Sequence, residues 1–271
     1  MAMMEMLAIP YEFECYAKKL SYSEWKMMEP FGLANLRYLF GIRREFSMIA
    51  GAANFWDPRE NLFRFQFTEL CPTIEEFSAI LRTPCNETTK MAVPVPEMNS
   101  RDVMRARAGL SKSAWMAILS KSPHSPGIDM KLALEMLIRL KKKSPAWITM
   151  MKIFLERLYL CEGPFGYRCS FRLFSVINQL KPGTSIIGVV LAETLIALDL
   201  FKAGKITSRF LPGSPLLLQL WLMEKTRHIG GPICKPSTVS SYAPPRKNLK
   251  DSTSTRASIS SCVVGGNLGY H

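Results

Sequence analysis

Glu193 is the residue whose type and setting most suggest chemistry in this chain of 271 residues. It interrupts the long apolar segment 185–203, and a carboxylate removed from water is costly unless a partner compensates it. One interpretation is a catalytic carboxylate of a hydrolase or transferase, working with a second group that folding brings near. The other, which we favour, is a hydrogen bond inside the core to a facing arginine or a backbone amide. The catalytic interpretation requires that two or more of these residues converge in one pocket: Glu193, Asp199, Glu69, Cys161 and His228.

The histidines and cysteines form no recognisable metal-binding or catalytic pattern. The three histidines (His124, His228 and His271) are scattered along the chain. The seven cysteines are irregularly spaced and include no Cys-x-x-Cys pair, which argues against a zinc ribbon. Cys161 and Cys169 flank a Gly-Pro-x-Gly loop that lacks the lysine and serine or threonine of a phosphate-binding loop. We therefore predict a protein without catalytic residues, metal, cofactor or small-molecule ligand.

The segment 55–84 carries strong local signals for structure. Asp57-Pro58 favours a turn, and residues 63–67 alternate between apolar and polar side chains, as in a half-buried strand. Thr73 and Glu76 have the spacing of a capping box, which predicts a helix that begins at Ile74. Pro84 lacks a backbone amide and restricts the preceding residue, so it ends that helix.

Glu75 and Glu76 are adjacent carboxylates and therefore a possible acid–base pair. They fall in the first turn of the expected helix, where the helix dipole and the cap favour negative charge. Adjacent positions on a helix also do not face each other. We interpret both residues as structural.

Two blocks of residues resemble the plant mobile domain superfamily. The first is Phe55-Trp56-x-Pro58, Phe63-x-Phe65, Glu69, Pro72-Thr73-x-Glu75-Glu76-Phe77 and Leu81, and the second is Leu191–Leu195 with Gly213–Trp221. The resemblance covers roughly residues 28–227 and is nearest to a retrotransposon-associated plant domain of unknown function. Some members of this group are called aminotransferase-like or phosphatase-like. The positions that we take as structural motif residues are Phe55, Trp56, Pro58, Phe63, Phe65, Pro72, Thr73, Glu76, Glu193 and Trp221.

This resemblance implies a mostly helical, transposon-derived domain, which in some members is linked to nuclear silencing and genome maintenance. We expect a nuclear protein, with the cytoplasm as the alternative. The implied function is a non-catalytic module that interacts with nucleic acid or with nuclear proteins. A degenerate transposon remnant without a selected activity is a further alternative.

The net charge of +13 is concentrated in the middle of the chain. Residues 1–100 hold 10 Lys/Arg against 13 Asp/Glu, a net of −3, whereas residues 101–172 hold 14 against 5, a net of +9. A basic surface attracts nucleic acid through phosphate contacts and the release of counterions, although lysines also serve only to solvate a surface. Because no base-reading module is present, we expect such binding to be non-specific. The candidate contacts are Arg101, Arg105, Arg107, Lys112, Lys141, Lys142 and Lys143.

The fold expected from these patterns is mostly α, with a small β-hairpin or short strand near residues 55–68. We expect one helical domain over 28–230, after an N-terminal extension (1–27) and before a low-complexity, disordered tail (231–271). Segment 185–203 contains charges and never reaches about 18 uncharged residues, so we interpret it as a core helix rather than a membrane span. Expected members of one shared core are Trp56, Phe63, Phe65, Trp147 and Phe154.

Overall fold

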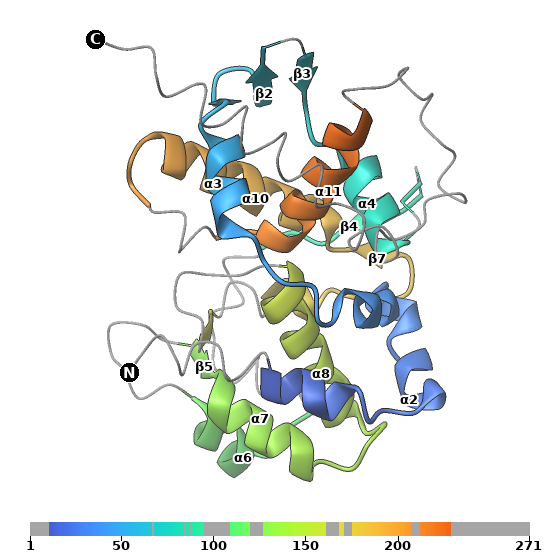
Figure 1. Cartoon of the computed structure of the whole chain (residues 1–271). Coiled ribbons are helices and arrows are strands. Elements are labelled where there is room, and N and C mark those ends of the chain that lie inside the picture. Colours follow the sequence, from blue (N-terminus) through green and yellow to red (C-terminus); the bar gives the residue numbers. More distant parts are fainter. Residues whose placement is uncertain are drawn as a thin grey trace. The chain divides into compact units, whose positions relative to one another are not determined.

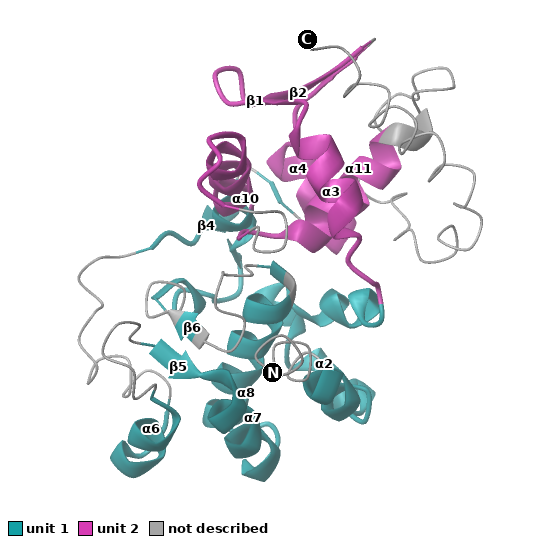
Figure 2. Cartoon of the chain, turned by 60° about the vertical axis from the view of Figure 1, so that its left-hand side comes forward, with its two compact units in different colours: residues 1–41, 85–190 teal, residues 42–84, 191–271 magenta. Residues whose placement is uncertain are grey.

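The fold is mostly helical with small sheets, as the sequence predicts (Figure 1). The computed structural model describes residues 11–66, 68–83, 85–86, 88–94, 109–119, 127–160, 168–170, 175–206 and 212–228. The chain divides into two compact units (Figure 2). Unit 1 comprises residues 1–41 and 85–190, and unit 2 comprises residues 42–84 and 191–271. The expected tail over 231–271 lies outside the described residues, and the expected domain limits at 28 and 230 stay a prediction.

Helices α2 (Tyr22–Lys26), α6 (Lys112–Ile118), α7 (Met130–Arg139) and α8 (Pro145–Leu155) of unit 1 begin at side-chain caps. Ser21, Ser111, Asp129 and Ser144 each accept a hydrogen bond from a backbone amide in the first turn that follows. Such caps satisfy amides that have no partner within the helix. The described helical elements of unit 1 include residues 11–17, α2 (Tyr22–Lys26), η1 (Glu29–Phe31), η2 (Ala34–Leu39), α6 (Lys112–Ile118), α7 (Met130–Arg139), α8 (Pro145–Leu155), the π-helical turn η4 (Glu156–Leu160) and residues 175–177.

Two small sheets complete unit 1. Strand β5 (Gly127–Asp129) pairs antiparallel with β6 (Arg168–Ser170). Strand β4 (Lys90–Met91) pairs parallel with β7 (Thr184–Ser185). A strand of two residues has no periodicity for sequence reasoning to detect.

An aromatic cluster lies in the core of unit 1. Phe13, from the helix over 11–17, stacks on Phe154 of α8 with ring centroids 5.0 Å apart. Phe40 contacts the edge of Phe13 and also the ring of Trp25. Burial of these rings places the N-terminal helices against α8.

The described residues of unit 2 form a three-stranded antiparallel sheet and four helices. The strands β1 (Trp56–Asp57), β2 (Leu62–Phe65) and β3 (Thr68–Leu70) lie in that order, with Phe63 opposite both Trp56 and Leu70. This is the β-hairpin region that the sequence predicts. The helices are α3 (Phe46–Ala53), α4 (Ile74–Leu81), α10 (Ile187–Lys202), whose first residues fall in unit 1, and α11 (Pro215–His228).

The capping box of α4 is confirmed. The Thr73 hydroxyl accepts from the Glu76 amide at 3.3 Å, and the Glu76 carboxylate accepts from the Thr73 amide at 3.2 Å. The helix ends at Leu81, and Arg82 follows in a left-handed conformation with φ 52°. Pro84, which the sequence predicts to end this helix, lies outside the described residues.

The aromatic residues predicted to share one core belong to two units. Trp56 and Phe63 are buried in unit 2, and Trp147 and Phe154 are buried in unit 1. Phe65, in unit 2, is only partly buried and stacks beside Phe63. An apolar pattern identifies which side chains leave water, but it does not say which of two cores receives them.

Candidate nucleic-acid interface

The three consecutive lysines 141–143 lie in the turn between α7 and α8. The apolar residues Leu132, Met136, Ile138 and Leu140 predict one helix over residues 129–143, with the lysines in its last turn. In the structure, α7 ends at Arg139 and Leu140 is extended. Lys143 adopts a left-handed conformation with φ 66°, and Ser144 then caps α8. A turn of this kind projects exposed side chains outward, and all three lysines are exposed. The lysines are therefore turn residues rather than the last turn of a helix.

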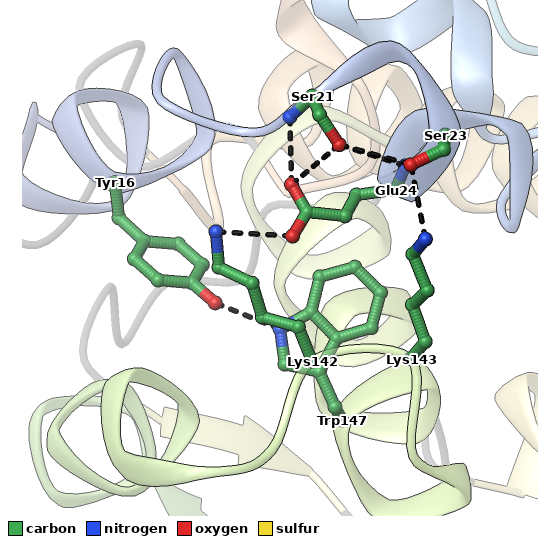
Figure 3. Close-up of polar contacts among 7 residues, drawn as sticks. All are labelled: Tyr16, Ser21, Ser23, Glu24, Lys142, Lys143 and Trp147. Carbon is green, nitrogen blue, oxygen red and sulfur yellow. Dashed lines mark hydrogen bonds and ion pairs between the residues drawn. The ribbon is translucent and has the colours of Figure 1, made fainter.

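Two of these lysines reach the first turn of α2 (Figure 3). The Lys142 ammonium lies 3.1 Å from the Glu24 carboxylate. The Lys143 ammonium donates to the Ser23 hydroxyl at 3.0 Å. These contacts join two parts of unit 1 that are more than a hundred residues apart in the chain.

A partly buried hydrogen bond near the turn joins α8 to the helix over residues 11–17. The indole nitrogen of Trp147 donates to the Tyr16 hydroxyl at 2.7 Å (Figure 3). Burial raises the pKa of Tyr16, while the Trp147 hydrogen bond opposes that shift. The Tyr16 hydroxyl is therefore a neutral acceptor at physiological pH. The hydrogen bond holds the first turn of α8, which follows the lysines, against the helix over residues 11–17.

Further lysines lie close to these contacts along the chain. Lys19 precedes the cap residue Ser21 by two residues, and Lys26 follows Ser23, the partner of Lys143, by three. Two or three residues of backbone span at most about 11 Å, so both lysines lie near the segment that contacts the turn. Both side chains are exposed. We call this group the lysine surface, and it consists of Lys19, Lys26, Lys141, Lys142 and Lys143.

The remaining predicted contacts are only partly described. Lys112 is exposed at the start of α6, which packs against α7. Arg101, Arg105 and Arg107 lie outside the described residues. Lys19 and Lys26 were missed because they belong to the first hundred residues, whose net charge is negative, and only the fold brings them beside the turn.

Lys152 contributes to the positive charge of the middle segment, but it is buried on α8. Its ammonium lies 4.3 Å from the centroid of the Phe31 ring, an attractive cation–π arrangement. Burial lowers the pKa of Lys152 because the charged form loses hydration. This lysine does not add to the lysine surface.

A second group of buried polar side chains lies where α8 passes into η4. Glu156 is fully buried and Arg157 is 2% exposed. Cys169, on β6, is also buried, and burial together with the Glu156 charge raises the pKa of its thiol. Such a thiol stays protonated and unreactive at neutral pH. Arg157, like Lys152, is counted in the net charge of residues 101–172 but lies in the core.

The motif residues of the two blocks meet in unit 2. The indole nitrogen of Trp221 donates to the Glu76 carboxylate at 2.7 Å, and Lys225 forms an ion pair with the same carboxylate. The indole nitrogen of Trp56 donates to Asp199 at 2.7 Å. Each of these side chains stabilises a contact between distant segments of unit 2.

Close backbone packing joins the two parts of the second block. The Ser214 amide donates to the Thr194 hydroxyl at 2.9 Å. A Cβ atom at Gly213 would lie 2.6 Å from the Thr194 Cα, and Gly213 has φ 81°, so only glycine fits there. Gln219, fully buried, accepts from the Glu45 amide and donates to the Arg43 carbonyl.

The other structural motif positions surround this arrangement. Phe63 packs between Trp56 and Trp221, with ring centroids 5.0 and 5.7 Å away. Phe55 and Phe65 are partly buried and contact each other. Pro72 is buried before the α4 cap, and Pro58 is exposed in the turn after β1.

Glu193 is partly exposed on α10 rather than buried. The side chain is therefore not fully removed from water, and Ala192 and Ile196 beside it are exposed. Of its suggested catalytic partners, Asp199 accepts the hydrogen bond from Trp56, and Glu69 forms an ion pair with Arg64 on the hairpin. Cys161 and the side chain of His228 lie outside the described residues.

Comparison with known proteins found no protein-family model, curated protein or solved structure that matches this chain. The resemblance to the plant mobile domain superfamily therefore stays a prediction from the residue pattern. Across the described ranges, no helix has the length and apolar character needed to cross a membrane. Within those same ranges, no three histidine, cysteine, aspartate or glutamate side chains gather in a way that could hold a metal ion.

Proposed function

We propose that this chain is a non-catalytic, transposon-derived interaction domain of the plant mobile domain type, which acts in the nucleus and binds nucleic acid without sequence preference. The family part of the proposal is supported by the two residue blocks. Their polar members Glu76, Trp221 and Trp56 are engaged in hydrogen bonds within unit 2. These residues therefore have a role in the fold that accounts for their presence in the motif without any catalytic role.

The lysine surface is the observation that carries the binding part of the proposal. Two segments with exposed lysines lie close enough for the Lys142–Glu24 and Lys143–Ser23 contacts, and the Trp147–Tyr16 hydrogen bond holds them together independently of those contacts. Exposed ammonium groups spaced over such a surface can each meet a phosphate of one nucleic-acid strand, and the released counterions favour binding. The first and middle thirds of the chain thus contribute to one positive region.

Lysine side chains favour affinity over sequence recognition. An ammonium group on a flexible stem acts as a point charge and lacks the fixed fork with which arginine reads guanine. Contacts to phosphate position a protein on nucleic acid and carry no base information. We therefore expect similar affinity for unrelated sequences.

The test is a salt titration of binding to fluorescently labelled DNA duplexes of unrelated sequence. For the wild-type chain, log affinity should fall linearly with log salt, with a slope of about −0.9 for each phosphate contacted. Replacement of Lys141, Lys142 and Lys143 by glutamine should lower affinity and slope on every sequence. Glutamine is preferable to glutamate, because a new carboxylate at position 142 would face Glu24 and disturb the fold.

The matched control replaces three exposed lysines outside the lysine surface, Lys90, Lys181 and Lys205, by glutamine. Strand β4, which carries Lys90, lies away from α7 in both views of unit 1 (Figures 1 and 2). The control changes net charge equally and should keep most of the affinity. Absence of wild-type binding at low salt would overturn the nucleic-acid part of the proposal and favour a nuclear protein as partner. Strong preference for one sequence would contradict the non-specific mode.

A further inference from the structure

Lys142, at the centre of the lysine surface, already has an anionic partner. The Glu24 carboxylate lies 3.1 Å from its ammonium, and the Glu24 side chain is only 10% exposed, against 44% for Lys142. The neighbouring Lys143 contacts the neutral hydroxyl of Ser23 instead. Two adjacent lysines therefore differ in what a phosphate must displace.

Glu24 is fixed in this position by the cap of α2. One carboxylate oxygen accepts from the Ser21 amide at 2.6 Å and from the Ser21 hydroxyl at 3.0 Å. The other oxygen faces Lys142 (Figure 3). Burial acts to raise the pKa of Glu24, but the hydrogen bonds from Ser21 and Lys142 outweigh it and lower that pKa. The group is thus an anion at neutral pH.

We propose that Glu24 competes with nucleic-acid phosphate for the Lys142 ammonium and so limits the affinity of the lysine surface. This inference rests on the proposed function, whose surface it refines. The exchange requires only that the exposed Lys142 side chain turns outward, because Ser21 continues to hold the carboxylate and α2 keeps its cap. Lys143 gives up only a hydrogen bond to an exposed hydroxyl, so it reaches phosphate at lower cost.

The substitution that tests this is Glu24→Gln in the full chain, with a labelled DNA duplex as the probe. Glutamine at this position keeps the reciprocal cap but loses the charge that holds Lys142. We expect affinity at low salt to rise roughly twofold to fivefold, the range of an exposed ion pair. Glu29→Gln is the matched control, because Glu29 is an exposed carboxylate in the same unit and its removal changes the net charge equally.

A double-mutant cycle separates this competition from a general charge effect. In a Lys142→Gln background, Glu24→Gln should give no more affinity than Glu29→Gln. In a Lys143→Gln background, the gain from Glu24→Gln should persist. Lys142→Gln alone should also reduce affinity less than Lys143→Gln alone, a comparison that leaves the α2 cap intact.

These experiments distinguish failure of the competition by Glu24 from failure of the proposed nucleic-acid binding. If wild type binds but Glu24→Gln binds no more tightly than Glu29→Gln, the competition is refuted and the lysine surface stands. A gain that persists without Lys142 also refutes it. If the wild-type chain does not bind at low salt, the proposed function fails and this inference fails with it. Circular dichroism of each variant checks that α2 and the fold are retained.

Discussion

The indole nitrogen of Trp221 donates a hydrogen bond to the carboxylate of Glu76, 145 residues earlier in the chain. The same carboxylate caps α4 through Thr73 and pairs with Lys225. One side chain thus completes a helix cap and fixes α11 against α4. This contact gives a structural reason for the presence of both residue blocks in one chain, since each contributes one half of it.

The first prediction concerns this pair. Trp221→Phe keeps an aromatic ring but removes the donor, so it should lower the free energy of unfolding by about 1.5–3 kcal/mol, as for other hydrogen bonds to charged groups. In a Glu76→Ala background the loss should be smaller, and urea denaturation of the four proteins gives the coupling. Trp25→Phe is the control, because Trp25 is buried in unit 1 and its effect should be independent of Glu76. Equal effects of Trp221→Phe in both backgrounds would contradict the pairing.

Sequence reasoning predicted the cap of α4 but not the contact between Trp221 and Glu76, because the first interaction is local and the second is not. The Thr73–Glu76 cap depends on two residues three positions apart, so the local pattern contains the whole interaction. The Trp221–Glu76 bond depends on how two helices pack, which no local pattern specifies. The resemblance to a family placed both residues in structural motifs, but it did not indicate that they touch.

For the candidate interface, a count of charge along the sequence likewise fails to say which charges lie on the surface. A count over residues 101–172 includes Lys152 and Arg157, which are buried in the core of unit 1. It omits Lys19 and Lys26, which the fold brings beside the 141–143 turn. A sum along the sequence treats every cation as surface charge, whereas phosphate meets only those that stay in water. Sequence reasoning also placed Lys141, Lys142 and Lys143 in the last turn of a helix rather than in a turn, and it did not identify their partner Glu24.

The second prediction concerns Gln219, whose side-chain amide bridges the Arg43 carbonyl at 3.0 Å and the Glu45 amide at 2.7 Å. Gln219→Leu has similar size but leaves both backbone groups without this partner, so it should lower the free energy of unfolding by about 1–3 kcal/mol. Gln179 makes the equivalent pair of bonds to Val93 at an exposed site in unit 1. There water can replace the lost bonds, so Gln179→Leu should have a clearly smaller effect in the same denaturation assay. A reversed order would contradict this account.

The third prediction is a pH dependence from Lys152. Burial lowers its pKa in the folded protein below the ordinary value of 10.5, so the unfolded chain binds more protons between those two values. Stability from this group therefore rises with pH through that window, and the full penalty of a buried charge is present below it. Lys152→Met removes the penalty and should stabilise the protein by about 1 kcal/mol at neutral pH.

The stabilisation by Lys152→Met should shrink as the pH rises above the folded pKa, because the wild-type lysine then becomes neutral. Thermal melting of both proteins across neutral and alkaline pH measures this difference. Lys131→Met is the control, since Lys131 is exposed on α7 and its replacement should give no such trend. A constant difference between Lys152→Met and wild type at all pH values would show that hydrophobic packing, not titration, explains the effect.

The last prediction separates stability from binding at Lys143. Its φ of 66° is a left-handed conformation that a side chain disfavours and glycine adopts readily. Lys143→Gly should therefore raise the free energy of unfolding by about 0.5–1 kcal/mol, after allowance for the greater freedom of glycine in the unfolded chain. Lys143→Gln keeps the strain and should not stabilise. Both variants remove the ammonium group, so both should weaken DNA binding to the same extent. If affinity instead followed stability, with Lys143→Gly binding better than Lys143→Gln, the geometry of the turn rather than the charge at position 143 would control binding.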